Sequence, residues 1–334
     1  MKLSTSIVFL FASYAAARAV KTEAVNDSAT CSLAADAANP TTITIRSNGK
    51  NREFLLWVSP GYDSNKPTPV IMSFHGRGGS PKGQFDLDQF TKAKNNLAGI
   101  VVYPQGIKAS TCWPLSADKS ANITQAEWQV YPGVKENDIL FANNVLDYLE
   151  GQYNVDKRRI YASGKSIGGG MVNLLACDEG TSKRIAAFAP VSGAYYTPSA
   201  TCKPETLKLV CSPGRKKIPL IEFHGGNDTT ISYAGGPRNG ECLPTIPHFI
   251  REWAIRDGLG TQNTTRPLAE NAVTYSYGSG ADEGLIQHVF ESDIGHDWPS
   301  TKPNHDNSKE GHHVASFDAT PIILDFFSKH RLPA

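Results

Sequence analysis

The sequence lacks several features that would indicate a membrane, nucleic-acid or metal function. After residue 19 no apolar run approaches about 18 residues, the length that a membrane-spanning helix needs. The formal net charge is only +1 over 334 residues, which does not favour a polyanionic partner such as nucleic acid. No C-x-x-C pair is present, so a structural zinc site is not indicated. No internal repeat, linker or low-complexity run divides the chain, and we expect one soluble domain.

Residues 1–19 have the pattern of a secretory signal peptide. Lys2 supplies the charged start, an apolar stretch follows, and small side chains occupy the cleavage positions. We therefore predict a secreted, extracellular protein. Residues 1–19 are expected to be removed, residues 20–40 to form a polar N-terminal arm, and residues 41–334 to form the folded domain.

An even number of cysteines favours disulfides in a secreted chain. Six are present, at positions 31, 112, 177, 202, 211 and 242, and they allow 15 pairings. Cys202 and Cys211 are close in sequence within one loop, so a bridge between them is the first choice. The pairing of the other four stays open. Three N-x-S/T sequons are predicted to be exposed glycosylation sites, at Asn26, Asn122 and Asn263.

Short apolar runs alternate with helical patterns along most of the chain. A hairpin is predicted around the Asn48-Gly49 turn, between strands 42–46 and 53–59. The further predicted strands are 69–74, 99–103, 160–162, 185–191, 218–223, 272–277 and 285–290, and the predicted helices are 85–95, 137–153, 171–177, 246–258 and 317–329. Residues 107–134 show no regular pattern. This order predicts an α/β fold with a mostly parallel sheet, helices on both of its faces and an antiparallel N-terminal hairpin.

The segment Gly164-Lys165-Ser166-Ile167-Gly168 lies between a predicted strand and a predicted helix. The G-x-S-x-G spacing is typical of a nucleophile held on a sharp strand-to-helix turn, where side chains two residues away would not fit. The turn would expose the Ser166 hydroxyl and put the Ile167 amide at a helix N-terminus, facing a developing oxyanion. The alternative is a phosphate-binding glycine loop, but no Lys-Ser/Thr pair follows the glycines.

Two further residues follow strand ends, where an open α/β sheet gathers its functional groups. Asp228 comes five residues after one predicted strand, and His296 comes six residues after another. A serine nucleophile needs a base, the base needs an acceptor, and the order Ser166, Asp228, His296 is that of α/β-hydrolases. Alternatively, Asp228 is a turn residue and His296 is one of nine histidines. A polar loop is expected to be solvated rather than to bind a metal, although it contains His305, His312 and His313.

Four blocks together resemble one family. They are Phe74-His75-Gly76-x-Gly78-Gly79, Gly164-x-Ser166-x-Gly168-Gly169-Gly170-Met171, His224-Gly225-x-x-Asp228 and Gly295-His296-x-Trp298-Pro299. They are similar to the signature blocks of secreted polyhydroxybutyrate-depolymerase-like esterases, carbohydrate esterase family 1, which includes fungal feruloyl esterases and acetyl xylan esterases. The resemblance runs from about residue 40 to 330. The chain departs from the pattern at Lys165 and in a long polar segment, Ser300 to His313.

The resemblance implies an α/β-hydrolase fold and a serine esterase. Ser166 would be the nucleophile, Asp228 the acid and His296 the base. The amides of Ile167 and Arg77 are expected to bind the oxyanion, with Gly78 as the next choice to Arg77. Side chains that could stack on a substrate are Trp298, Tyr195 and Tyr196.

Feruloyl ester hydrolysis is the first expectation for the reaction. Acetyl xylan esterase and polyhydroxyalkanoate depolymerase are the alternatives within the same mechanism, and a binding protein on a hydrolase fold is the alternative of another class. The expected partner is an esterified plant polysaccharide or a small aromatic ester. We expect a monomer with no metal, no cofactor and no membrane or nucleic-acid partner.

Overall fold

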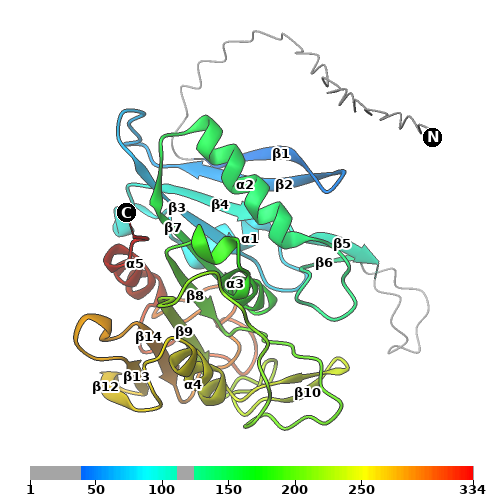
Figure 1. Cartoon of the computed structure of the whole chain (residues 1–334), viewed down its shortest axis with the longest axis vertical. Helices are drawn as coiled ribbons and strands as arrows, with labels where there is room; N and C mark the ends of the chain where they lie inside the picture. The colour runs from blue at the N-terminus through cyan, green and yellow to red at the C-terminus, as the bar shows by residue number, and fades with distance from the viewer. Residues whose placement is uncertain (1–38, 111–123, 334) are drawn as a thin grey trace, which may run out of the picture. The chain divides into compact units, whose positions relative to one another are not determined.

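The structure is a computed structural model that describes residues 39–110 and 124–333. These residues form a fold built around a ten-stranded sheet (Figure 1). Its order is β1-β2-β4-β3-β7-β8-β9-β14-β13-β12. The bounds are β1 Thr41–Ser47, β2 Lys50–Val58, β3 Thr68–Phe74, β4 Ile100–Pro104, β7 Val155–Lys165, β8 Ala187–Val191, β9 Leu220–Gly225, β12 Asn263–Ala269, β13 Ala272–Tyr277 and β14 Ile286–Glu291. From β4 to β14 in this order the strands are parallel, and antiparallel pairs extend both edges. The predicted mostly parallel sheet is confirmed.

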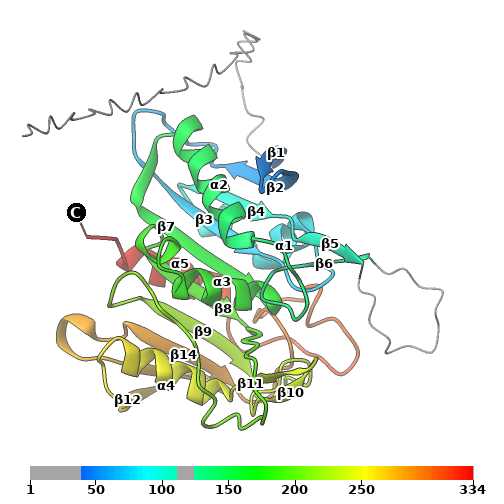
Figure 2. The same cartoon turned by 45° about the vertical axis from the view of Figure 1, so that its right-hand side comes forward.

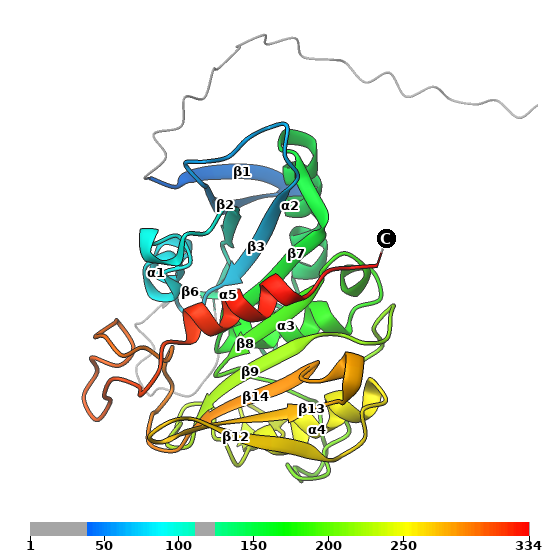
Figure 3. The ribbon, with the colours of Figure 1, turned by 90° about the vertical axis from the view of Figure 1, so that its left-hand side faces the viewer.

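Helices cover both faces of this sheet. They are α1 Pro81–Asp88, α2 Asp138–Gln152, α3 Ile167–Cys177, α4 Ile246–Arg256 and α5 Ala319–Lys329. The helices α2, α3 and α4 pack on one face, and α1 and α5 on the other (Figures 1 and 3). Side chains alternate along each strand, so Val70 and Met72 of β3 face the first group while Ile71 faces the second. Both faces are buried, which explains the continuous apolar runs of the central strands.

The N-terminal hairpin forms where the Asn-Gly pair predicts it. Asn48 and Gly49 have φ of 49° and 74°, the left-handed conformation that a two-residue hairpin turn requires. Ser47 therefore pairs with Lys50, and β1 runs antiparallel to β2.

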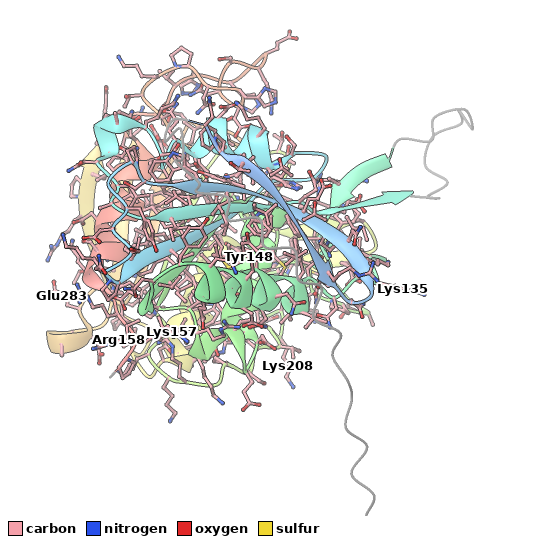
Figure 4. All side chains as sticks on the ribbon, turned by 90° about the horizontal axis from the view of Figure 1, so that it is seen from above. Lys135, Tyr148, Lys157, Arg158, Lys208 and Glu283 are labelled. Carbon is pink, nitrogen blue, oxygen red and sulfur yellow. A yellow bond between two sulfur atoms is a disulfide. The ribbon has the colours of Figure 1, made fainter. Side chains whose placement is uncertain are left out.

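The helix α2 is held by its cap and by one aromatic contact. Asn137 Oδ1 accepts a hydrogen bond from the Leu140 amide at 2.9 Å, which satisfies one free donor of the first turn. Tyr148, labelled on this helix in Figure 4, meets Phe54 of β2 edge-on, with ring centroids 5.6 Å apart. The predicted helix over residues 137–153 is confirmed.

Other boundaries differ from the prediction for identifiable reasons. The helix predicted at 85–95 begins at Pro81, after the cap Ser80, and α1 ends at Asp88 because Gln89 is left-handed, with φ of 54°. The region 107–134 contains an unpredicted strand pair, β5 (Ile107–Ser110) and β6 (Thr124–Glu127). A short hairpin, β10 (Gly236–Arg238) and β11 (Glu241–Leu243), and the edge strand β12 were also not predicted.

The predicted bridge between Cys202 and Cys211 is wrong. Cys177 pairs with Cys211 and Cys202 pairs with Cys242, with Cα–Cα distances of 4.6 and 5.2 Å. The loop between β8 and β9 passes the β10–β11 hairpin at Cys202 and then the end of α3 at Cys211, so each of its cysteines meets a partner that is distant in sequence. Cys31 and Cys112 lie outside the described residues, as do the sequons at Asn26 and Asn122. Asn263 is exposed, as predicted.

Candidate active site

Ser166 lies on a sharp turn between β7 and α3. Its backbone has φ of 60° and ψ of −123°, a conformation that a non-glycine residue adopts only when the surrounding structure enforces it. The Ser166 carbonyl accepts hydrogen bonds from the Gly170 amide at 3.0 Å and the Ala194 amide at 2.9 Å, which fix the turn. The predicted strand, turn and helix are all present.

The two flanking glycines leave no room for a side chain. A Cβ on Gly164 would lie 2.7 Å from the Gly168 carbonyl oxygen, and a Cβ on Gly168 would lie 2.1 Å from the Phe74 oxygen. Real Cβ atoms do not approach this closely, so the spacing of the motif follows from the contact between α3, β7 and the end of β3.

The glycine-rich turn after β3 lies against Ser166. A Cβ on Gly76 would be 3.3 Å from Ser166 Cβ. Within the turn the Gly78 amide donates to the Ala126 carbonyl at 2.9 Å, and the Gly79 amide donates to the Gly76 carbonyl at 3.0 Å. Among the described residues the Arg77 amide has no such acceptor, which favours Arg77 over Gly78 as an oxyanion donor. Ile167 is the first residue of α3, so its amide has no partner within the helix.

His75 shapes this turn from below. Its Nε2 accepts a hydrogen bond from the Gly106 amide at 3.0 Å, and its Nδ1 lies 2.7 Å from the Gly76 carbonyl, to which it can donate. Burial lowers the pKa of His75 to about 4, so the ring is neutral near pH 7. This arrangement gives His75 a structural role in shaping the loop.

The strands β9 and β14 are parallel neighbours (Figure 2). Asp228 and His296 follow the ends of these two strands and contact each other. His296 Nδ1 lies 2.7 Å from Asp228 Oδ2. The other carboxylate oxygen accepts hydrogen bonds from the amides of Thr230 and Ile231, at 2.8 and 2.7 Å, which fix its orientation. The structure therefore brings into contact the carboxylate and imidazole that the sequence analysis paired, from positions 68 residues apart.

The electrostatics keep this pair as carboxylate and neutral imidazole. Burial favours the neutral acid, but the hydrogen bonds from His224 and His296 hold the pKa of Asp228 well below its ordinary value. Burial, and next the Lys165 cation, lower the pKa of His296 from its ordinary 6.5 against the opposing effect of Asp228. A neutral imidazole held at Nδ1 leaves Nε2 available to accept a proton.

Ser166 is not in direct hydrogen-bonding contact with the pair of Asp228 and His296. Within residues 39–110 and 124–333, no hydrogen bond joins Ser166 Oγ to the His296 ring. Both side chains are nonetheless largely buried, at 7% and 12% exposure, at the same edge of the sheet. Nucleophile–base contacts are often long in free enzymes and tighten when substrate is bound.

A second buried charge cluster lies behind Asp228, and the sequence analysis missed it. Glu222 and His224 alternate on β9 and face the same side; His224 Nδ1 is 2.9 Å from Glu222 Oε1, and its Nε2 is 3.3 Å from Asp228 Oδ2. Against the effect of burial, Glu222 and Asp228 raise the pKa of His224 to about 10, so this ring is a cation. His288 of β14 lies beside the same carboxylate, with Nδ1 2.8 Å from Glu222 Oε2. A glutamate inside an otherwise apolar strand was the signal available in the sequence.

Two of the three aromatic residues predicted to contact substrate are core side chains. Trp298 is 1% exposed and donates from Nε1 to Thr320 Oγ1 at 3.1 Å. Tyr195 is 3% exposed and stacks on Phe249, with ring centroids 3.5 Å apart. Both rings are packed in the core, since Trp298 also meets Phe90 edge-on with ring centroids 5.9 Å apart. Only Tyr196 presents part of its surface.

Tyr196 belongs to a row of contacting side chains beside the glycine turn. Its ring meets Tyr131 edge-on at 5.7 Å, and the Arg77 guanidinium lies 4.5 Å from the Tyr131 ring centroid. Arg77 Nε also donates to the buried Glu127 at 2.8 Å. This row places aromatic and cationic surface next to the glycine-rich turn that follows β3.

The three histidines of the loop after His296 do not form a cluster. His312 Nδ1 lies 2.7 Å from Asp297 Oδ1, while His313 Nε2 lies 3.4 Å from Asp293 and His305 is exposed. In the described residues no group of three or more histidine, cysteine or acidic side chains has the geometry of a metal site. A search of the same residues finds no helix long and apolar enough to cross a bilayer.

Sequence comparison finds relatives among fungal esterases. A bifunctional acetylxylan esterase/xylanase of Neocallimastix patriciarum is 25% identical over 257 residues, 75% of this chain and 32% of that protein. Feruloyl esterase B of Piromyces equi is 27% identical over 233 residues, 67% of this chain and 39% of that protein. The chain thus spans about a third and about two fifths of these two relatives. Feruloyl esterase B of Thermothelomyces thermophilus is 28% identical over 272 residues, 75% of this chain and 84% of that protein. No family model matches the sequence.

Comparison with solved structures identifies the fold. An acetyl xylan esterase from Aspergillus awamori gives a TM-score of 0.53 at 17% identity and covers 79% of this chain and 96% of that one. A thermostable esterase gives a TM-score of 0.52 at 14% identity, with coverages of 88% and 64%. The fold is that of the α/β-hydrolases, and the resemblance predicted from the four sequence blocks is confirmed.

Proposed function

We propose that this homologue of fungal feruloyl and acetylxylan esterases is a secreted serine esterase that hydrolyses carboxylic esters on plant cell-wall polysaccharide. The observation that carries the proposal is the pair of Asp228 and His296, 2.7 Å apart, at the sheet edge where the strained turn presents Ser166. A carboxylate that orients an imidazole beside a serine on such a turn is the arrangement that activates a hydroxyl for acyl transfer.

In the proposed mechanism His296 Nε2 takes the Ser166 proton as Oγ attacks the ester carbonyl. Asp228 stays ionised, fixes the ring through Nδ1 and stabilises the imidazolium that forms. The amides of Ile167 and Arg77 donate to the oxyanion, and His296 returns the proton to the departing alcohol. Water then attacks the acyl-enzyme by the same route. Binding of substrate is expected to complete the contact between hydroxyl and imidazole.

Feruloyl esters are the proposed first substrate. The names of two relatives support this choice, and so does the row of Tyr196, Tyr131 and Arg77, against which a planar aromatic acyl group or a sugar face could lie. Acetylated xylan is the second candidate, supported by the Neocallimastix relative. A polyhydroxyalkanoate is the third, and it rests on the motif resemblance alone.

Two measurements test the proposal. The wild type should hydrolyse p-nitrophenyl acetate and Ser166→Ala should lose this activity; a wild type without turnover on any ester would favour a binding protein on a hydrolase fold. Rates on methyl ferulate, acetylated xylan and a polyhydroxyalkanoate, compared by kcat/KM, then decide the substrate. An acetyl preference would replace the feruloyl assignment.

Secretion is proposed from the N-terminal pattern and the two disulfides, which persist in oxidising compartments. N-terminal sequencing of protein from a culture medium should begin after residue 19. A protein retained in cells with an intact N-terminus would contradict it.

A further inference from the structure

A buried ion pair joins the residue before the nucleophile to the loop after the base. Lys165 is the last residue of β7, and its Nζ lies 2.7 Å from Asp306 Oδ2, with the side chains 8% and 4% exposed. Both residues fall where the sequence departs from the family pattern, at the second position of the elbow and in the polar segment that follows His296. A buried pair contributes little to stability on balance, since desolvation offsets the attraction. The location of the pair, between the Ser166 strand and the His296 loop, therefore suggests its role better than its contribution to stability does.

The carboxylate of this pair is firmly placed in its own loop. Asp306 Oδ2 accepts a hydrogen bond from the Trp298 amide at 3.1 Å, and the Asp306 amide donates to Asn304 Oδ1 at 2.8 Å. Trp298 comes two residues after His296. The ion pair consequently ties the segment that carries the base to the strand that carries Ser166.

The charges of the pair are also coupled electrostatically to the imidazole. Lys165 lowers the pKa of His296, and His296 in turn contributes to the lowered pKa of Asp306. Asp228, from the loop after β9, and the His224 cation of β9 also act on the pKa of His296, whereas the next residue, Asp297, pairs with His312, with Oδ1 2.7 Å from its Nδ1. Removing one member of the pair would leave a single uncompensated charge beside the base.

We propose that Lys165 and Asp306 are positioning residues for the esterase reaction, which fasten the His296 loop to the nucleophile strand and balance the charge beside the imidazole. The proposal rests on the function proposed above. It assigns a role to the two features of this chain that the esterase motifs leave unexplained.

Removing the positive or the negative charge of the pair should shift the pKa of His296 in opposite directions. Lys165→Met leaves the Asp306 carboxylate and should raise the pKa of His296, whereas Asp306→Asn leaves the Lys165 cation and should lower it, each by about half a unit or more. The double variant should return to within about 0.3 units of the wild type, because it removes both charges. The acid limb of kcat/KM on p-nitrophenyl acetate should move in the same directions, since that limb reports the free base.

Titration of the histidine ring by NMR, with the His296 resonance assigned by its loss in His296→Gln, measures the same pKa without turnover. This distinguishes the two proposals: an inactive wild type would refute the esterase, while the NMR shifts would still test the pair. If Lys165→Met does not fold, Lys165→Arg keeps the charge and should keep the wild-type pKa, and Asp306→Asn carries the test.

Two control variants distinguish the effect of the buried charges on the pKa of His296 from a purely structural effect. Lys309→Met removes a half-exposed cation 3.3 Å from the other oxygen of Asp306 and should leave the pKa of His296 unchanged. Ser192→Ala removes an uncharged brace, the 3.0 Å hydrogen bond from Ser192 Oγ to the Asp297 carbonyl, and should also leave it unchanged. Single deletions at Lys165 and Asp306 that shift the pKa in the same direction, or not at all, would overturn the proposal.

Discussion

Gly168→Ala tests whether the contact between the elbow and the end of β3 is required for both folding and activity. The added Cβ would lie 2.1 Å from the Phe74 carbonyl oxygen and 2.6 Å from the His75 oxygen. An ordinary contact of this kind is about 3.5 Å, so the backbone must shift by more than about 1 Å. The neighbouring atoms belong to the main chain and cannot rotate away.

The expected change in the free energy of unfolding is the sum of two opposing effects. Overpacking of a tight site costs about 3 kcal/mol at the upper end of its usual range. Alanine in a helix gains about 1 kcal/mol over glycine, so the net loss in the free energy of unfolding should be about 2 kcal/mol. The displaced turn also carries the Arg77 amide, and a displacement of about 1 Å at a reacting group can reduce the rate about 100-fold.

The assay is urea unfolding followed by circular dichroism, together with kcat/KM on p-nitrophenyl acetate. Gly151→Ala is the matched control, because this glycine lies in α2 with no atom within 4 Å of its added Cβ. It should be neutral or stabilise by up to about 1 kcal/mol and leave turnover unchanged. A Gly168→Ala variant with wild-type stability and turnover would refute the steric account of the motif.

Three further outcomes are expected. Because Glu222 and Asp228 raise the pKa of His224 to about 10, the protonated ring stabilises the folded state fully below its ordinary 6.5, and this contribution is lost as the pH rises toward 10. Urea unfolding from pH 6 to 10 should therefore show a smaller fall in stability for His224→Gln than for the wild type; parallel curves would contradict it. Replacing both Cys177 and Cys211 by serine opens a loop of 34 residues' separation and should reduce the free energy of unfolding by about 4 kcal/mol, measured by denaturant titration, whereas an unchanged midpoint would show that the bridge is dispensable. Tyr196→Ala should raise KM for methyl ferulate about five-fold and leave KM for p-nitrophenyl acetate unchanged, and equal effects on both esters would exclude stacking of the aromatic acyl group.

The catalytic candidates were accessible from sequence because each depends on local chemistry. The elbow needs glycine at two fixed positions, and the ends of parallel strands meet at one edge, so Asp228 and His296 could be paired from the order of strands alone. The Asn-Gly hairpin is similarly local, since only its own turn decides it.

What the sequence did not yield depends on contacts between distant segments. The partner of Cys211 is set by where the loop after β8 crosses α3, which no spacing reveals. Burial of Trp298 depends on Thr320 and on the packing of α5, so a loop aromatic could not be distinguished from a core one. Lys165 appeared only as a departure from the family pattern, because its partner lies 141 positions away along the chain.

The outer strand β12 has a consequence for how the molecule behaves at high concentration. Six of its seven residues are exposed, and an unprotected edge of this kind can accept a strand from another molecule and nucleate aggregates. Pro267 removes one amide donor from that edge, Arg266 adds charge, and the register is interrupted between Pro267 and Ala269. We therefore expect this edge, which also has a sequon at its first residue, Asn263, to resist pairing with a strand from a neighbouring copy.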